Sequence, residues 1–227
     1  MHHYTNLVLI KAVANAINPL NKKIVFVGGA AVSLYADNIS LNVRPTEDVD
    51  VVVEVLDYTE FSQFEDKLRQ IGFQNDILSG IICRYTIEGI TVDILPVTSN
   101  ATMHANPWHE EGFNNAIEYK LMDANSIFIL SPGYFLASKF SAFNDRGNND
   151  GRTSKDFEDV VFILQNRKNI WNELNEADPK VKIYLQEQFQ RLFQNPYLRE
   201  WVECHLDRNL ENSASWMLQK MREFISS

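Results

Sequence analysis

Residues 44–53 read Arg-Pro-Thr-Glu-Asp-Val-Asp-Val-Val-Val, a polar segment that runs into a series of β-branched residues. The β-branched series is typical of a buried strand, and the strand period of two places the side chains of Asp48 and Asp50 on one face of a sheet. Two neighbouring carboxylates repel each other, so they are costly beside an apolar strand unless a metal ion or a basic group compensates their charge. This stretch therefore predicts a sheet with an acidic site at the start of one strand.

A third carboxylate lies within a later apolar strand. Residues 90–95 read Ile-Thr-Val-Asp-Ile-Leu, so Asp93 stands among residues that are apolar apart from one threonine. If this strand lies beside the strand of Asp48 and Asp50, three carboxylates meet on one face. Such oxygen-only ligands suit Mg²⁺ or Mn²⁺, and two ions about 3.5 to 4 Å apart can bind the attacking and leaving oxygens of a phosphoryl transfer. The opposing interpretation is structural: Asp48 caps a turn, Asp50 faces solvent and Asp93 pairs with a nearby arginine.

Hydrophobic periodicity in the first 130 residues predicts an α+β fold, with a small mixed sheet and flanking helices. The helices are expected over residues 4–17, 30–36 and 59–71, the last one capped by Thr59. The strands are expected over residues 23–27, 49–55, 81–87, 90–97 and 127–130, the last one at a sheet edge. Glu88 and Gly89 predict an antiparallel hairpin, and residues 98–115 predict a long ordered loop.

From residue 131 onward the pattern is almost entirely helical. Ser131 and Pro132 predict a helix start, because proline is favoured at the first helical position. The expected helices cover residues 132–144, 154–166, 180–194, 197–209 and 214–225. We therefore predict two domains, a mixed core at residues 1–130 and a helical domain at residues 131–227 that ends in a C-terminal bundle.

Composition narrows the classes of protein. With 227 residues, 45% of them apolar, the chain can bury an ordinary core, and its formal charge of −9 argues against a broad basic surface that coats nucleic acid. No apolar run approaches the roughly 18 to 20 residues of a membrane span, and the N-terminus lacks the layout of a signal peptide. We therefore expect a cytoplasmic protein with no membrane partner. Cys83 and Cys204 belong to no paired motif, so neither a disulfide framework nor a zinc site is expected.

Two further features bear on phosphate binding. Gly28 and Gly29 precede a helix, so their backbone can approach a phosphate closely, and Ser33 can add a hydroxyl one helical turn later. Lys139 lies within an apolar stripe of the helix from Pro132, which points it inward and suits it to stabilise a triphosphate. The plain alternatives are a simple glycine turn, a surface serine, and a lysine that runs along apolar surface with its ammonium group in solvent.

Together these motifs resemble those of the polymerase-β-like nucleotidyltransferase superfamily, which carries a glycine pair, an Asp-x-Asp strand and a third strand carboxylate. The Arg-x-Thr-x-Asp-x-Asp form of residues 44–50 is most similar to the AbiEii-type nucleotidyltransferase toxins of bacterial toxin–antitoxin and phage-defence systems, including the MenT-like enzymes. The similarity includes Lys139 and the Lys-Asp-x-x-Asp segment at residues 155–159, and it covers about residues 24–164. Two departures are Gly29, in place of the serine that often follows the first glycine, and the polar insert at residues 147–151.

The resemblance implies that the first domain is the nucleotidyltransferase core and that its three aspartates form the metal site. Asp48 and Asp50 would bind both metal ions, Mg²⁺ or Mn²⁺, and Asp93 would complete the site and act as, or near, the general base. The residues that would hold the nucleoside triphosphate are Gly28, Gly29, Ser33, Arg44, Thr46 and Lys139.

The resemblance also implies that Lys139 and Asp156 are further active-site residues, contributed by the helical domain. Asp156 has a structural alternative, because it fits a capping box with residues 153–155 and so can close a helix N-terminus. Arg44 and Arg146 could bind phosphate or neutralise carboxylates, and the plain alternative for Arg146 is an exposed loop arginine.

Three functions remain open at this point. The leading one is a toxin-like enzyme that transfers a nucleoside monophosphate from a nucleoside triphosphate to an acceptor, either a tRNA or a protein, with an antitoxin as a possible partner. The second is an antibiotic nucleotidyltransferase of the aminoglycoside type, since acidic pockets suit polycationic drugs. The third is a module that binds nucleotide or antitoxin without catalysis.

Overall fold

The computed structural model describes residues 2–37, 43–55, 57–97, 106–121, 126–207 and 213–227. The chain divides into two compact units. The first, called here the sheet unit, comprises residues 1–34 and 39–131. The second, called the helical unit, comprises residues 35–38 and 132–227.

The sheet unit is built on a sheet of seven strands in the order β3-β4-β5-β2-β1-β7-β6. The strands are β1 (Ile24–Val27), β2 (Asp48–Glu54), β3 (Gln74–Asn75), β4 (Arg84–Ile87), β5 (Ile90–Val97), β6 (Ile117–Lys120) and β7 (Ser126–Ile129). Strand β2 runs parallel to β5 and antiparallel to β1, and β1 runs parallel to β7. All four residues of β1 are buried, as their unbroken apolar run predicts for a central strand. The mixed sheet expected from the sequence is therefore confirmed.

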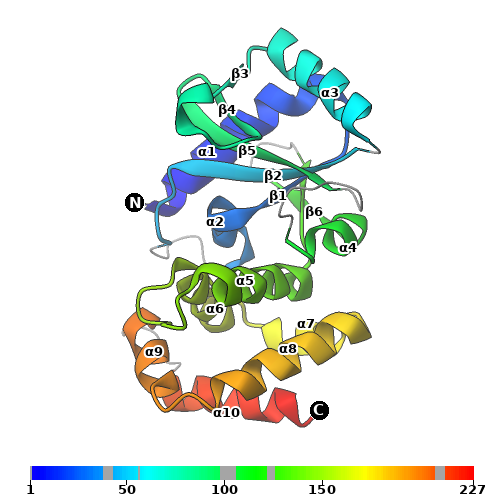
Figure 1. Ribbon diagram of the computed structural model, residues 1–227. Coiled ribbons are helices and arrows are strands. Elements are labelled where there is room, and N and C mark those ends of the chain that lie inside the picture. Colours follow the sequence, from blue (N-terminus) through cyan, green and yellow to red (C-terminus); the bar gives the residue numbers. More distant parts are fainter. Residues whose placement is uncertain (1, 38–42, 56, 98–105, 122–125, 208–212) are drawn as a thin grey trace. The chain divides into compact units, whose positions relative to one another are not determined.

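In the described part of the sheet unit, four α-helices accompany the sheet: α1 (His2–Ile17), α2 (Gly28–Ala31), α3 (Tyr58–Gln70) and α4 (His109–Asn114). Helix α3 buries Phe61, Phe64 and Leu68 on one face, as its spacing predicts. Its cap is Asp57, whose side chain accepts a hydrogen bond from the backbone N–H of Glu60, so the predicted Thr59 cap is wrong. Figure 1 shows α3 and α4 on opposite sides of β2.

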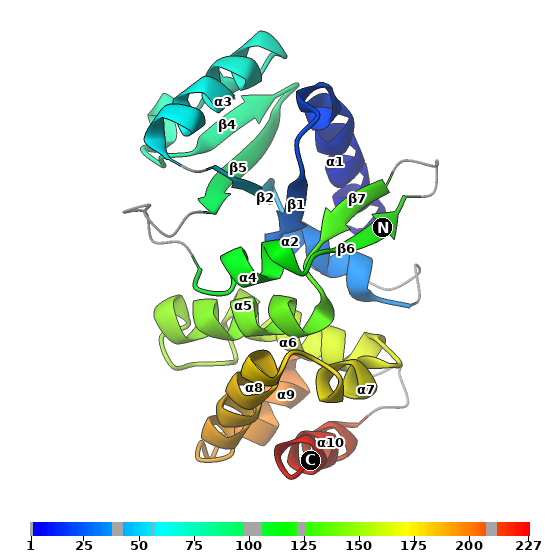
Figure 2. The same ribbon diagram turned by 90° about the vertical axis from the view of Figure 1, so that its right-hand side faces the viewer.

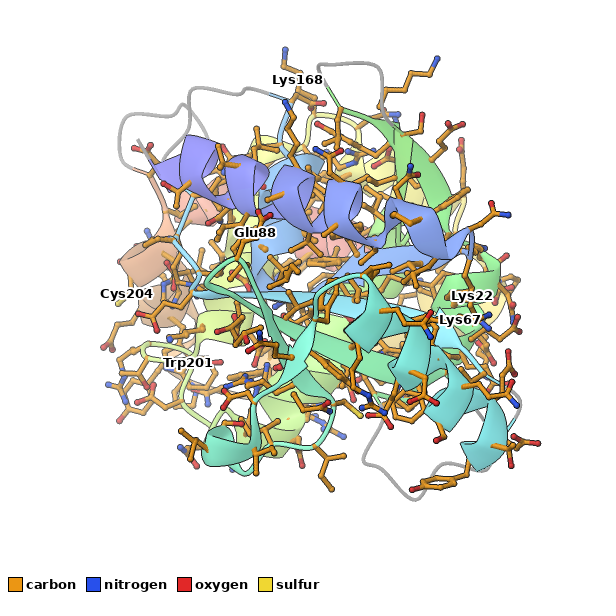
Figure 3. All side chains as sticks on the ribbon, turned by 90° about the horizontal axis from the view of Figure 1, so that it is seen from above. Lys22, Lys67, Glu88, Lys168, Trp201 and Cys204 are labelled. Atoms are coloured by element: carbon orange, nitrogen blue, oxygen red, sulfur yellow. The ribbon has the colours of Figure 1, made fainter. Side chains whose placement is uncertain are left out.

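The expected hairpin is confirmed, and β4 pairs antiparallel with β5. Glu88 and Gly89 adopt positive φ angles of 49° and 81°, the conformation that a tight two-residue turn requires. Glu88 is labelled at this turn in Figure 3. Strand β4 begins only at Arg84, three residues later than expected, because residues 77–79 form a short 3₁₀ helix and Cys83 has a φ of 68°.

Two expectations about the sheet unit need correction, and one strand was not expected. The strand near residues 127–130 is not at the edge, because β6 lies outside it. Strand β6 escaped notice because it carries alternating charges and is mostly exposed, as an edge strand often is. Residues 106–115 are not wholly irregular, since they contain α4; residues 98–105 of the expected loop lie outside the described part.

The helical unit contains α5 (Pro132–Arg146), α6 (Lys155–Asn166), α7 (Ile170–Asn175), α8 (Pro179–Leu192), α9 (Leu198–His205) and α10 (Ala214–Ile225), all visible in Figure 2. Aromatic side chains join them: Phe140 and Phe224 each meet Phe189 edge-to-face, with ring centroids 5.3 and 5.7 Å apart. The bundle differs from expectation in two places: α7, a helix of six residues, is too short to show a period, and α9 ends at His205, before the expected end at residue 209, which lies outside the described part. No helix in the described ranges is long and apolar enough to cross a membrane.

Candidate active site

The register of the central strands brings the three aspartates to one face. Asp50 in β2 lies opposite Asp93 in β5, and Asp48 lies two residues before Asp50 in the same strand. Residues directly opposite in a strand pair project to the same face, as do residues two apart. The expectation that the strand of Asp93 lies beside the strand of Asp48 and Asp50 is therefore confirmed.

Arg84 of β4 is a cation on this face. It lies opposite Asp93 in the hairpin, and its Nε and Nη2 donate to the two carboxylate oxygens of Asp93 at 2.7 Å each. Its Nη2 also lies 3.5 Å from Oδ2 of Asp48. The hydrogen bond to Asp93, more than any other interaction, raises the pKa of Arg84 above its ordinary value. We call these four residues, Asp48, Asp50, Asp93 and Arg84, the carboxylate face.

Sequence reasoning expected an arginine partner for Asp93 only as the structural alternative, and it did not identify Arg84. The signal was present in the sequence. A two-residue turn at Glu88 and Gly89 pairs Ile87 with Ile90, and counting outward along both strands places Arg84 opposite Asp93.

Gly28 lies directly against Asp50. Its φ is 69°, a left-handed conformation that favours glycine, and a Cβ atom built on it would lie 1.8 Å from Oδ2 of Asp50. Gly29 is tight for a different reason, since a Cβ there would lie 2.7 Å from Cγ2 of Thr46 and 3.0 Å from Nη2 of Arg44. The glycine pair therefore lets the segment of Arg44 and Thr46 and the carboxylate of Asp50 approach the backbone at the start of α2.

Asn6 of α1, which sequence reasoning missed, holds this segment in place. Its side-chain amide donates to the carbonyl of Arg44 at 3.0 Å, and its carbonyl accepts from the backbone N–H of Thr46 at 3.2 Å. Asn6 is fully buried. The hydroxyl of Thr46 is buried as well, and it has no hydrogen-bond partner in the described part of the chain.

Ser33 differs from expectation. The helix begins at Gly28, not at Ala30, and continues from Val32 as a 3₁₀ turn that buries Ser33. The hydroxyl of Ser33 donates to the carbonyl of Ala30 at 3.0 Å, so the alternative of a surface serine is wrong. A role for Ser33 in phosphate binding stays a prediction.

The oxygens of the carboxylate face suit a divalent cation in kind, because carboxylates are the ligands that Mg²⁺ and Mn²⁺ prefer. The side chain of Asp48 is 40% exposed, so a cation can reach it from solvent. Within the described ranges, no three His, Cys, Asp or Glu side chains are grouped closely enough to hold a metal ion. At Asp93, Arg84 donates to both carboxylate oxygens. The carboxylates therefore match such an ion in chemistry, and in this arrangement Arg84 is the counter-ion of Asp93.

Lys139 belongs to a cluster inside the helical unit. It is 5% exposed, and its Nζ lies 2.7 Å from Oδ2 of Asp159 and 3.3 Å from Oδ1 of Asp156. Arg146, the last residue of α5, donates to Oδ2 of Asp156 from Nε at 2.8 Å and to Oδ1 from Nη2 at 3.0 Å. The inward lysine is therefore confirmed, and the alternative with its ammonium group in solvent is wrong. We call Lys139, Arg146, Asp156 and Asp159 the lysine cluster.

Asp156 is not the cap of α6. The hydroxyl of Ser154 accepts from the backbone N–H of Phe157 and caps the helix, whereas the carboxylate of Asp156 is 4% exposed and bound to Arg146 and Lys139. Burial raises the pKa of Asp156, but the hydrogen bond from Arg146 and the charge of Lys139 outweigh burial and lower the pKa below its ordinary value. Arg146 is 69% exposed, yet its place in this ion pair corrects the expectation of a plain loop arginine.

No model of a protein family matches the sequence, and no curated protein matches it either. Solved structures match in fold. The solution structure of the antibiotic-resistance factor ANT(2'')-Ia has a TM-score of 0.50 and 14% identity, over 86% of this chain and 97% of that one. An antigenic nucleotidyltransferase-like protein from Paracoccidioides brasiliensis has a TM-score of 0.49 and 16% identity, over 89% of this chain and 94% of that one. The chain thus has a nucleotidyltransferase-like fold, and identities this low show the fold alone.

Proposed function

We propose that this protein is a metal-dependent nucleotidyltransferase, which moves a nucleoside monophosphate from a nucleoside triphosphate to an acceptor and releases pyrophosphate. One observation carries the proposal. The register of β2 and β5 sets Asp50 opposite Asp93, with Asp48 on the same face, in a sheet of nucleotidyltransferase-like fold.

The roles of the aspartates follow from their positions. Asp48 and Asp50 would hold the divalent cations, Mg²⁺ or Mn²⁺, and Asp93 would complete the set. Bound at these oxygens, two cations would polarise the transferred phosphoryl group and neutralise its charge. Asp93 would accept the proton of the acceptor hydroxyl, and for this its carboxylate needs one oxygen free of Arg84.

The nucleotide would lie at the glycine pair. Gly28 and Gly29 let Asp50, Thr46 and Arg44 lie close against the backbone at the start of α2, where a side chain would collide with them. Arg44 lies beside Gly29 and carries the positive charge that a triphosphate attracts. The buried hydroxyl of Thr46 offers a further donor. Ser33 is the weakest member of the predicted set, because its proton is already donated to Ala30.

For the acceptor we propose a tRNA or a protein hydroxyl, in a toxin–antitoxin or phage-defence system. The support is the form of residues 44–50, which resembles the AbiEii-type and MenT-like toxins. The net charge of −9 agrees with an enzyme that touches only an acceptor end, because such contact needs few basic residues. An antitoxin would be the regulatory partner.

An antibiotic is the second candidate acceptor, and a specific observation favours it. The fold matches that of ANT(2'')-Ia, which is an antibiotic-resistance factor. An acidic site also suits a polycationic drug.

One experiment separates the acceptors and tests the reaction. The full chain is incubated with each α-³²P-labelled nucleoside triphosphate and Mg²⁺, in parallel with total tRNA, cell lysate protein or an aminoglycoside, and label transfer is followed by gel and thin-layer chromatography. We expect transfer to one acceptor class, and its loss in Asp48→Ala and Asp50→Ala. Asp66→Ala, which changes an exposed aspartate on α3, is the matched control. Transfer that survives both site substitutions would exclude the metal mechanism, and nucleotide binding with no transfer to any acceptor would favour the non-catalytic module.

A further inference from the structure

Arg84 is the residue of the carboxylate face for which the proposed reaction gives no role. Its guanidinium lies between two of the expected metal ligands: Nη2 is 2.7 Å from Oδ2 of Asp93 and 3.5 Å from Oδ2 of Asp48. A cation that bridges these two carboxylates needs the same oxygens. A guanidinium and a divalent cation also repel each other at such distances. The contact seen here and a fully occupied metal site therefore compete.

The backbone before Arg84 is shaped to make this contact. Cys83 is 6% exposed and has a φ of 68°, a left-handed conformation that is uncommon for a residue with a Cβ atom. Its carbonyl accepts a hydrogen bond at 2.8 Å from the N–H of Ile94, the residue that follows Asp93 in β5. The hairpin register places Arg84 opposite Asp93, and the left-handed conformation of Cys83 ends the regular strand directly before Arg84.

The charge of Arg84 is permanent. A guanidinium stays protonated throughout the pH range in which proteins are folded, so Arg84 cannot leave the carboxylates by losing a proton. It can leave only by moving. The side chain is 21% exposed, and Asp48 is more exposed still, so this edge of the face is open to solvent.

We propose that Arg84 exchanges places with the catalytic cation: it bridges Asp93 and Asp48 while no divalent ion is bound and releases both when one binds. Arg84 is then a positioning residue. It offsets the repulsion between the carboxylates of Asp93 and Asp48 in the metal-free site, and it sets the affinity of the site for metal. The inference rests on the proposed function, because it takes Asp48 and Asp93 as metal ligands.

Nitrogen-15 NMR of the arginine side chains tests the exchange directly. A guanidinium Nε–H held by a carboxylate at 2.7 Å gives a protected, shifted signal, which Arg84→Lys removes and so assigns. We expect saturating Mg²⁺ to abolish the protection and move the signal toward that of a free arginine. A protected Arg84 signal that persists at saturating Mg²⁺ would overturn the exchange.

Metal affinity gives the second readout, independent of activity. Mn²⁺ binding, measured by electron paramagnetic resonance, is compared in the parent, Arg84→Gln, Arg84→Lys and Arg69→Gln. We expect Arg84→Gln to bind Mn²⁺ about tenfold more tightly, because a competing charge is removed close to the ion. Arg84→Lys keeps the charge but cannot hold both oxygens of Asp93, and we expect tighter binding than in the parent. Arg69→Gln removes a positive charge that is bound to Asp66 and Asn75, and it should leave the affinity unchanged.

The outcomes separate this inference from the proposed function. If Arg84→Lys binds Mn²⁺ no more tightly than the parent, or Arg84→Gln binds it more weakly, the exchange is wrong. If saturable binding is lost in the double variant Asp48→Asn/Asp50→Asn while the Arg84 signal stays protected, only the exchange fails. If neither the parent nor Arg84→Gln binds Mn²⁺, or binding survives that double variant, the metal mechanism itself fails.

Discussion

The carboxylate face and the lysine cluster contain similar groups, but the first has an excess of negative charge and the second is balanced. The carboxylate face sets three aspartates against one arginine, and its Asp48 is 40% exposed. The lysine cluster sets two aspartates against a lysine and an arginine, and both of its aspartates are nearly fully buried. A buried cluster must be balanced, because an unpaired charge away from water is costly. A site that takes up cations must keep an unbalanced charge within reach of solvent. We therefore expect substitutions to separate activity from stability differently in the two regions.

The largest effect is expected at the carboxylate face. Asp48→Asn should lower nucleotidyl transfer by about 10³-fold, since a preorganised electrostatic contact to the transition state is lost. The free energy of unfolding should change by less than about 0.5 kcal/mol, because Asp48 is partly exposed and its contact to Arg84 is long. Steady-state kinetics and urea unfolding measure the two quantities. A large loss of stability would mean that Asp48 has a structural role, and the carboxylate face would then not differ from the lysine cluster in the way proposed.

The lysine cluster should respond in the opposite way. Lys139→Met should lower the free energy of unfolding by about 3 kcal/mol, because it leaves the buried Asp159 without the cation at 2.7 Å. The double variant Lys139→Met/Asp159→Asn should recover much of this loss, and a double-mutant cycle measures the coupling. If Lys139→Met instead abolishes transfer with unfolding unchanged, Lys139 is an active-site residue, and the prediction made from the family resemblance gains its support.

Gly28→Ala should lower both the stability of the protein and its activity. The new Cβ would collide with Asp50 and adopt a φ of 69°, so we expect a loss of about 2 kcal/mol in stability together with a loss of transfer. Gly80→Ala is the matched control, because Gly80 has a φ of 68° and nothing within 4 Å of the added atom. It should show the backbone cost alone. Equal losses of stability in both variants, measured by urea unfolding, would show that the approach of Asp50 to Gly28 is unimportant.

The smallest effect is an acid dependence of the lysine cluster. The pKa of Asp156 in the folded protein lies below its ordinary value, so its contribution to stability is present above the unfolded pKa and is lost as the pH falls through the folded pKa. Between about pH 5 and pH 2 we expect the unfolding free energy of Asp156→Asn to fall less steeply than that of the parent. Parallel slopes would show that the pair with Arg146 adds nothing to folded-state stability.

Local sequence alone determines the direction of several key side chains and the register of one hairpin. The period of two puts Asp48 and Asp50 on one face whatever lies beside their strand. The Glu88 and Gly89 turn determines the hairpin register, and with it the pairing of Arg84 with Asp93, although counting along the strands was needed to see it. The apolar stripe around Lys139 predicted an inward lysine because a helix presents its third and fourth neighbours on one side.

The tertiary structure decided what those residues meet. Strand β2 lies parallel to β5, and this arrangement sets Asp50 opposite Asp93. It depends on the path of the chain through α3 between these strands, which no local period in the sequence encodes. Three other contacts join positions far apart in sequence. Gly28 lies against Asp50, and Asn6 binds residues 44–46. Lys139 pairs with Asp156 and Asp159. Periodicity determines the direction of a side chain on its own element, whereas its partner is determined by packing between elements.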